Sequence, residues 1–255
     1  MSAEPTALVA TTDDLLFAGR LRLRQPARGH RAGSDAVLLA AACPAGARRV
    51  VDLGCGAGTV GLRVAQVEDA AEVCLVDRDP ALLALTNENA GANGLAARCR
   101  TVAGDCLDRR FAASGAGLSG WAEVVLTNPP FYVPGAGTVS PERHKAGAHV
   151  LSGDLRDWVK GGLRCLAPRG TIVLIHRADA LVSVIEALGG RFGGLKIRPV
   201  HPRAEAPAHR MLVLGRRGSR AAPVILPPLV LHGPDGRFTP LAAALHEGTA
   251  RLAWE

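Results

Sequence analysis

The sequence predicts an α/β fold, a mostly parallel sheet with a reversed final strand and helices on both faces. Short apolar runs alternate along the chain with longer stretches of helical character, and this alternation is typical of parallel sheets. A glycine-rich turn follows the first central run, as in folds that bind ligands at strand ends. The last two apolar runs are joined by a loop too short for a crossover helix, so they should be antiparallel.

The expected strands are short runs rich in Val, Ile and Leu that end in an acid, an amide, a His or a glycine. In chain order they cover residues 48–54, 72–77, 123–128, 170–176, 195–202 and 210–215.

Three stretches have helical spacing and end in Gly or in Pro-x-Gly, as helix C-termini often do. They cover residues 79–94, 153–170 and 177–190. The tail contains one turn signal, Pro234-Asp235-Gly236, and we expect it to pack on the main domain. We therefore predict an N-terminal segment, 1–47, that covers a cofactor site, a central domain, 48–220, and an extension, 221–255.

Composition excludes several classes of protein. The longest uninterrupted apolar run, Ala36 to Cys43, is far shorter than the roughly 20 residues of a membrane span. Residues 1–14 contain acids and no basic segment, unlike a signal peptide, so we expect a cytoplasmic protein without a membrane partner. The 6 cysteines form no C-x-x-C pair, which argues against a structural metal or a disulfide framework. We expect them to be reduced and buried.

The positive charge is concentrated in one part of the chain. Residues 140–220 contain 15 Lys and Arg but only 6 Asp and Glu, whereas the rest of the chain is slightly acidic. Such a concentration suggests an anionic partner such as a nucleic acid. Solubility alone is the alternative explanation.

The stretch VVDLGCGAGTVG combines an acid at a strand end, Asp52, with three glycines, Gly54, Gly56 and Gly58. Glycines allow positive φ and close approach of a ligand to the backbone. Read from Gly56, the stretch also matches a dinucleotide-binding fingerprint. Two features argue against a nicotinamide dehydrogenase. Asp52 would repel a pyrophosphate but would hold a cationic amino-acid group, and the fingerprint would begin several residues beyond the strand.

Acids follow three successive strands, namely Asp52, Asp77 and Asp105. Open α/β sheets bind ligands at this edge. Asp77 could accept both ribose hydroxyls of an adenosine, and Asp105 could accept from its amino group. Helix capping or a solvated turn is the alternative for any one of these acids.

The stretch VVLTNPPF ends a strand at Asn128. Pro129 and Pro130 have no N–H for a ladder, so they stop the strand and leave carbonyls pointing outward. The Asn128 side chain and the Pro129 carbonyl then offer two neutral acceptors suited to an NH2 group, and Phe131 offers a face on which a planar target can stack. We therefore expect a catalytic set of Asn128, Pro129, Pro130 and Phe131, in which positioning activates the amine. An ordinary strand-ending turn is the alternative.

In this order, VVDLGCGAG, VDRDP, GDCLD and NPPF resemble the S-adenosylmethionine-dependent methyltransferases of the Rossmann-like class, from about residue 29 to residue 215. The resemblance implies a seven-stranded, mostly parallel sheet with a reversed final strand, and S-adenosylmethionine as cofactor. With the acids above, it implies cofactor binding by Arg31, Asp35, Asp52, Gly54, Cys55, Gly56, Gly58, Asp77, Arg78, Asp105, Cys106 and Asn128.

The N-P-P-F motif is similar in methyltransferases that act on adenine N6, guanine N2 or a glutamine side chain, and it does not separate them. Residues 12–42 resemble the N-terminal signature of bacterial tRNA-Val N6-adenine methyltransferases, through Gln25-Pro26, Gly29, Arg31, Gly33, Asp35 and Leu38-Leu39. The resemblance implies an RNA amine, adenine N6 in tRNA, as substrate. Protein glutamine and ribosomal RNA guanine remain alternatives, as does a non-catalytic RNA-binding protein.

The basic residues that we expect to contact RNA lie in three segments. Contacts to phosphate position an RNA without reading its sequence. Plain surface charge is the alternative for each residue singly. The expected contacts, in a monomer or homodimer, are Arg28, Arg143, Lys145, Arg198, Arg203 and Arg210.

Overall fold

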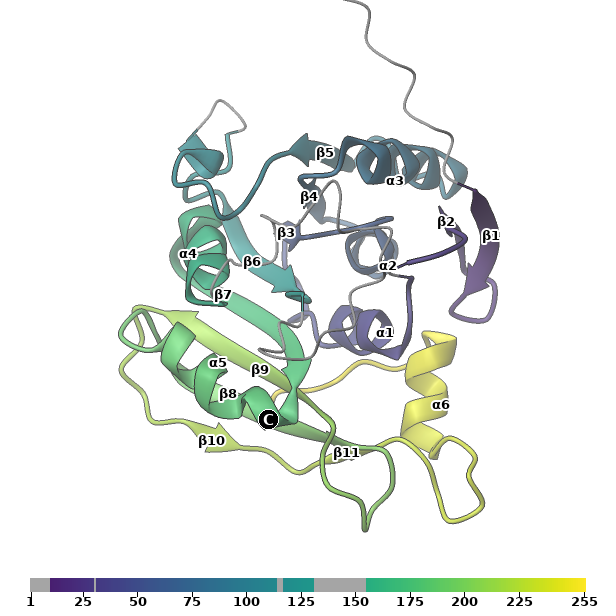
Figure 1. The fold of residues 1–255 in the computed structure, drawn as a ribbon, viewed down its shortest axis with the longest axis vertical. Helices are drawn as coiled ribbons and strands as arrows, with labels where there is room; N and C mark the ends of the chain where they lie inside the picture. Colours follow the sequence, from purple (N-terminus) through teal and green to yellow (C-terminus); the bar gives the residue numbers. More distant parts are fainter. Residues whose placement is uncertain (1–9, 30, 114–116, 131–154) are drawn as a thin grey trace, which may run out of the picture.

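The computed structural model describes residues 10–29, 31–113, 117–130 and 155–255. Its centre is a twisted sheet between two layers of helices (Figure 1). The strands of the sheet's body are β3 (Arg49–Leu53), β4 (Glu72–Asp77), β5 (Cys99–Ala103), β6 (Ala122–Thr127), β7 (Leu166–Arg177), β8 (Phe192–His201) and β9 (Arg210–Arg217).

In space these seven strands follow the order β5, β4, β3, β6, β7, β9, β8. The strands from β5 to β7 are parallel, whereas β9 is antiparallel to both of its neighbours. The predicted seven-stranded sheet with a reversed final strand is therefore confirmed.

Helices cover both faces because the central strands are apolar on both sides. Val50 of β3 lies in one buried cluster and its neighbour Val51 lies in the other. In the described part of the chain, the first face carries α1 (Ser34–Ala41), α2 (Thr59–Val67) and α3 (Pro80–Ala92), and the second carries α4 (Leu155–Cys165) and α5 (Leu181–Leu188). Two short 3-10 turns, η1 (Phe111–Ala113) and η3 (Ala178–Ala180), complete these layers.

The boundary between α4 and β7 differs from the prediction. The stretch 153–170 was expected to be helical up to its Pro-x-Gly, but α4 ends at Cys165 and β7 begins at Leu166. The pairing of β7 with β6 shifts after Leu166, and Arg169 has a φ of 65°. The proline and glycine therefore mark a bulge inside a strand, because both residue types interrupt a ladder as well as a helix.

A hairpin precedes the sheet, and we had not predicted it. β1 (Thr11–Leu16) pairs antiparallel with β2 (Leu21–Pro26). β2 alternates strictly, with Leu21 and Leu23 buried and Arg22 and Arg24 exposed. This period of two is a strand signal, which the attention to its arginines obscured.

The tail packs on the same core as the sheet. β10 (Val224–Ile225) and β11 (Leu229–Val230) add parallel to β8, and α6 (Pro240–Glu247) lies against α1 (Figure 1). The indole N–H of Trp254 donates to the carbonyl of Ala42 at 2.7 Å, so the tail also caps the C-terminal end of α1.

All 6 cysteines are free and buried, as predicted. Burial raises the pKa of the Cys74 and Cys99 thiols to about 11, so both stay protonated at neutral pH. No helix within the described ranges is long and apolar enough to cross a bilayer.

Candidate functional site

A pocket opens where the carboxyl ends of β3, β4 and β5 meet. Because parallel strands end at one edge of the sheet, residues far apart in the sequence converge there. Five of the predicted cofactor residues line it, namely Gly54, Asp77, Arg78, Asp105 and Cys106. The remaining described lining residues are Leu53, Val76, Gly104 and Trp158.

The glycine loop is held against the end of β4. The amides of Gly54 and Cys55 both donate to the carbonyl of Val76, at 2.8 and 2.9 Å. Gly54 has a φ of 77°, and a Cβ on it would lie 2.9 Å from the ring of Trp158. Only glycine therefore lets the loop turn and approach the indole this closely.

Asp77 and Asp105 face the pocket, and each accepts from nearby backbone. The two carboxylate oxygens of Asp77 accept from the amides of Gly56, at 2.9 Å, and Asp79, at 3.0 Å. Asp105 accepts from the amide of Leu107 at 2.9 Å. A carboxylate oxygen has a second lone pair, so both acids retain acceptor capacity for ligand hydroxyl or amino groups.

Asp52 lies beneath the loop and is not among the described residues that line the pocket. It is 2% exposed and accepts from the amide of Gly61 at 2.8 Å, near the start of α2. Burial raises the pKa of Asp52 to about 7; the Gly61 hydrogen bond opposes this and the charge of Asp77 adds to it. Its observed role is to brace the loop and the helix behind it.

This raised pKa gives a testable pH dependence. A carboxyl that is harder to ionise when folded stabilises the fold below its unfolded pKa, near 4, and loses that contribution as pH rises to about 7. We expect Asp52→Asn, which stays neutral, to gain stability relative to wild type over this range, by about 2 to 4 kcal/mol. Urea unfolding of both ligand-free proteins at pH 4, 5.5, 7 and 8 measures this, and a pH-independent difference would contradict it.

Asn128 follows directly after β6 and has an unsatisfied acceptor. Its Oδ1 is buried, and no described residue gives it a hydrogen bond. Buried acceptors are rarely left without a donor. The next residue, Pro129, is buried, and Pro130 is exposed. The fourth predicted catalytic residue, Phe131, lies outside the described residues.

Trp158 is a pocket residue that the sequence did not reveal. Its indole N–H donates to the Thr127 hydroxyl at 2.7 Å, and that hydroxyl donates to the Leu53 carbonyl at 2.8 Å. This chain of bonds ties the ends of β3 and β6 together beside the residue that precedes Asn128. A tryptophan in an amphipathic helix gives no signal of such a role, because the same spacing suits core packing.

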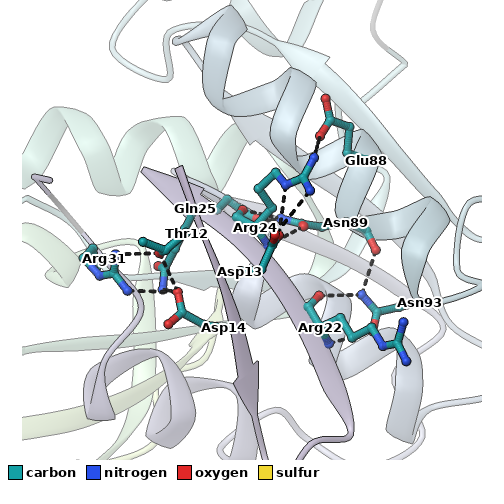
Figure 2. A network of polar contacts seen from close by, with 11 residues as sticks. Thr12, Asp13, Asp14, Arg22, Arg24, Gln25, Arg31, Glu88, Asn89 and Asn93 are labelled. Carbon is teal, nitrogen blue, oxygen red and sulfur yellow. Dashed lines mark hydrogen bonds and ion pairs between the residues drawn. The ribbon is translucent and has the colours of Figure 1, made fainter. Parts of the chain in front are cut away.

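Two other predicted cofactor residues have partners elsewhere, and neither is among the described residues of the pocket. The Arg31 guanidinium donates to Thr12 at 2.8 Å and pairs with Asp14 at 2.9 Å, on the hairpin (Figure 2). Asp35, in the first turn of α1, pairs with Arg210 at 2.9 Å. Cys55 is buried in the glycine loop.

The expected RNA contacts differ in their surroundings. Arg210 is engaged by Asp35, and Arg198 donates to the tail carbonyls of Pro227, at 3.1 Å, and Ala253, at 2.6 Å. Arg28 and Arg203 are exposed. Arg143 and Lys145 lie outside the described residues.

The chain is similar to known methyltransferases. Residues 32–152 match the family model "Methyltransferase small domain". The chain is 32% identical to a crystal structure of a predicted O-methyltransferase from Agrobacterium tumefaciens, with a TM-score of 0.72, covering 86% of this chain and 98% of that one.

Two curated relatives have names that mention RNA. A tRNA1(Val) (adenine(37)-N6)-methyltransferase of Tolumonas auensis is 26% identical over 220 residues, which are 84% of this chain and 87% of that protein. A ribosomal RNA large subunit methyltransferase G of Streptomyces avermitilis is 37% identical over 134 residues, which are 51% of this chain but 29% of that protein.

Proposed function

Because this chain belongs to the S-adenosylmethionine-dependent methyltransferases with a methyltransferase small domain, we propose that it methylates an exocyclic amine of RNA, adenine N6 in tRNA. The observation that carries the proposal is the buried, unpartnered Oδ1 of Asn128 at the end of β6. An acceptor in this state requires an N–H or O–H donor, and an amine provides one.

The pocket residues fit S-adenosylmethionine, the cofactor of this family. We propose that Asp77 accepts from the ribose hydroxyls and that Asp105 and Cys106 contact the adenine. The backbone at Gly54 leaves space that a Cβ would fill. The methionine part would lie along Gly54 to Gly58, with Asp52 bracing the loop from below. When bound, the cofactor supplies a methyl group activated by a sulfonium.

The target amine would lie against Asn128. Its two N–H groups would donate to Asn128 Oδ1 and to the carbonyl of Pro129, which directs the nitrogen lone pair away from both acceptors and toward the methyl group. The N–C bond forms as the S–C bond breaks, and the amine proton leaves to water. A strong base is unnecessary, because the nitrogen becomes acidic only as it gains the methyl group.

Three observations support RNA as the substrate. The relative from Tolumonas auensis is named for an adenine in tRNA and spans most of this chain. The exposed Arg28 precedes α1, and the exposed Arg203 follows β8. Both connections lie at the edge of the sheet where β6 ends at Asn128, because α1 leads back to the start of β3 and β8 runs parallel to β7.

We also propose three parts within one unit: residues 1–47 over the cofactor site, the central domain 48–220 and the extension 221–255. The bonds from the tail to α1 and β8 support placing the extension on the central domain.

Product analysis tests the proposal. Purified protein is incubated with labelled S-adenosylmethionine and, separately, with unmodified tRNA, ribosomal RNA or a protein extract. The methylated residue is then identified after digestion. We expect N6-methyladenosine in tRNA. A methylated glutamine in protein, or the absence of any product, would contradict an RNA amine as substrate.

A ribosomal RNA amine is the second candidate. It is favoured by the relative from Streptomyces avermitilis, whose matched segment has the higher identity. That match covers less than a third of the relative, so the tRNA enzyme, aligned over most of both chains, is the better guide. In the same experiment, label in ribosomal RNA alone would select this candidate.

The role of Asp77 gives a second prediction. Asp77→Ala should weaken S-adenosylmethionine binding by about 1–3 kcal/mol, because it leaves both the ligand hydroxyls and the Gly56 amide without their acceptor. Calorimetry measures the affinity. Asp79→Ala is the matched control, since that acid caps α3 through the Ala81 amide; its affinity should stay within about twofold of wild type, less than one hydrogen bond. Unchanged affinity in Asp77→Ala would remove this residue from the cofactor site.

A further inference from the structure

Two asparagines of α3 occupy the edge of β2 that faces away from β1. Asn93 accepts from the amide of Arg22, at 2.9 Å, and donates to its carbonyl, at 2.7 Å. Asn89 does the same for Arg24, accepting at 2.7 Å and donating at 2.8 Å (Figure 2). Each side chain therefore takes the place of a backbone partner in a neighbouring strand.

The spacing of these residues explains the match. Alternate residues of a strand lie about 6 to 7 Å apart, and residues four apart on a helix are separated by about 6 Å along its axis. Asn89 and Asn93 are four apart, and Arg22 and Arg24 are two apart. One face of α3 can therefore bond alternate residues of β2.

Only one of the two asparagines also contacts the glycine loop. The second N–H of Asn89 donates to the carbonyl of Ala57, between Gly56 and Gly58, at 2.9 Å. Asn93 instead donates to the carbonyl of Asn89 in its own helix. One turn earlier, the buried Thr86 hydroxyl lies 2.8 Å from the carbonyl of Gly56.

The bonds to β2 fix the orientation of the Asn89 amide. Its oxygen faces an N–H of Arg24 and one of its hydrogens faces the carbonyl of the same residue, so a flipped amide would place donor against donor and acceptor against acceptor. The other hydrogen is then directed at the loop. Asn89 is 2% exposed, so water does not compete freely for these groups.

We propose that Asn89 is a positioning residue that holds the glycine loop in its ligand-binding shape and that the β1–β2 hairpin fixes its orientation. The hairpin thereby becomes part of the cofactor site without touching the ligand. The inference rests on the proposal that this loop holds S-adenosylmethionine.

The test compares Asn89→Ala with its matched control Asn93→Ala. Both variants remove two bonds to β2, but only the first removes the bond to Ala57. We expect Asn89→Ala to raise the dissociation constant and the KM for S-adenosylmethionine about tenfold, which corresponds to one buried hydrogen bond. Its kcat at saturating cofactor should be unchanged, because ground state and transition state lose the same interaction. Asn93→Ala should stay within about twofold for all three quantities, less than one hydrogen bond.

Two further variants keep the test decisive. Asn89→Ser, whose hydroxyl is too short to bridge β2 and the loop, replaces Asn89→Ala if that variant does not fold. Thr86→Val removes a loop contact without touching the hairpin, and it should also raise the KM.

The outcomes separate the two proposals. If wild type does not bind S-adenosylmethionine, or if Asp77→Ala binds it normally, the proposed cofactor site is wrong. If wild type binds and Asp77→Ala is impaired, equal effects of Asn89→Ala and Asn93→Ala would overturn the role of Asn89. A fall in kcat with unchanged KM in Asn89→Ala would overturn it as well.

Discussion

Replacing Asn128 by alanine is expected to lower kcat by about 100-fold or more, which is the usual cost of removing one preorganised polar group that stabilises a transition state. The reason is the buried Oδ1, which has no described partner and which we assign to the target amine. The dissociation constant for S-adenosylmethionine should change by less than about twofold, since the adenosine contacts lie at the ends of β4 and β5. Single-turnover kinetics and calorimetry measure the two quantities.

Asn87→Ala is the control for this variant. Asn87 is an exposed asparagine of α3 that accepts from the Thr101 hydroxyl at 3.1 Å, so its loss should leave kcat and affinity unchanged. If cofactor affinity fell in parallel with kcat in Asn128→Ala, the residue would belong to the cofactor site and not to the amine site. An active variant would refute the assignment altogether.

Adjacent glycines of α4 should respond to alanine in opposite directions. A Cβ on Gly161 would lie 2.5 Å from the backbone carbonyl oxygen of Cys106, whereas a Cβ on Gly162 would make ordinary contacts at 3.4 Å or more with Ile172, Val125 and Leu53. Gly161→Ala should therefore destabilise the fold by about 1–3 kcal/mol through overpacking. Gly162→Ala should stabilise it by about 0.5–1 kcal/mol, because alanine restricts the unfolded helix less favourably populated by glycine.

Urea unfolding of the two variants and wild type gives these free energies, with each variant serving as the control of the other. Gly161→Ala should also weaken cofactor binding, because Cys106 lines the pocket and must move away from α4. Equal stabilities for the two variants would show that α4 is not packed against the Cys106 backbone.

The sequence was sufficient for the parts of the site that depend on strand ends. Gly54, Asp77 and Asp105 line one pocket because each follows a parallel strand, and parallel strands end at the same edge. The reversed β9 was predictable for a similar reason, since its loop is too short for a crossover. Local pattern and topology agree at these positions.

Contacts between distant segments could not be predicted. Asp35 and Arg210 are 175 positions apart, and their ion pair removes one residue from the expected cofactor contacts and the other from the expected free cations. The absence of acids from residues 16–33 suggested an unpaired basic surface. However, β1 brings Asp13 to Arg24, at 2.9 Å, and Asp14 to Arg31. Charge along a chain does not show which charges meet after folding.

Asp52 illustrates the same limit for burial. Its place at a strand end was correctly read, but the sequence could not show that the Gly61 amide takes up its carboxylate beneath the loop. Trp158 was missed because its indole meets Thr127 only after α4 folds back on the sheet.

The asparagine-filled edge of β2 also affects how copies of this protein can associate. A strand edge with unpaired amides and carbonyls is a template for adding a strand from another molecule. Asn89 and Asn93 occupy those groups on β2 at Arg22 and Arg24. The opposite edge belongs to β1, where Asp13 and Asp14 stand in succession. Two such acidic edges would repel each other, so the hairpin is protected against intermolecular sheet formation on both sides.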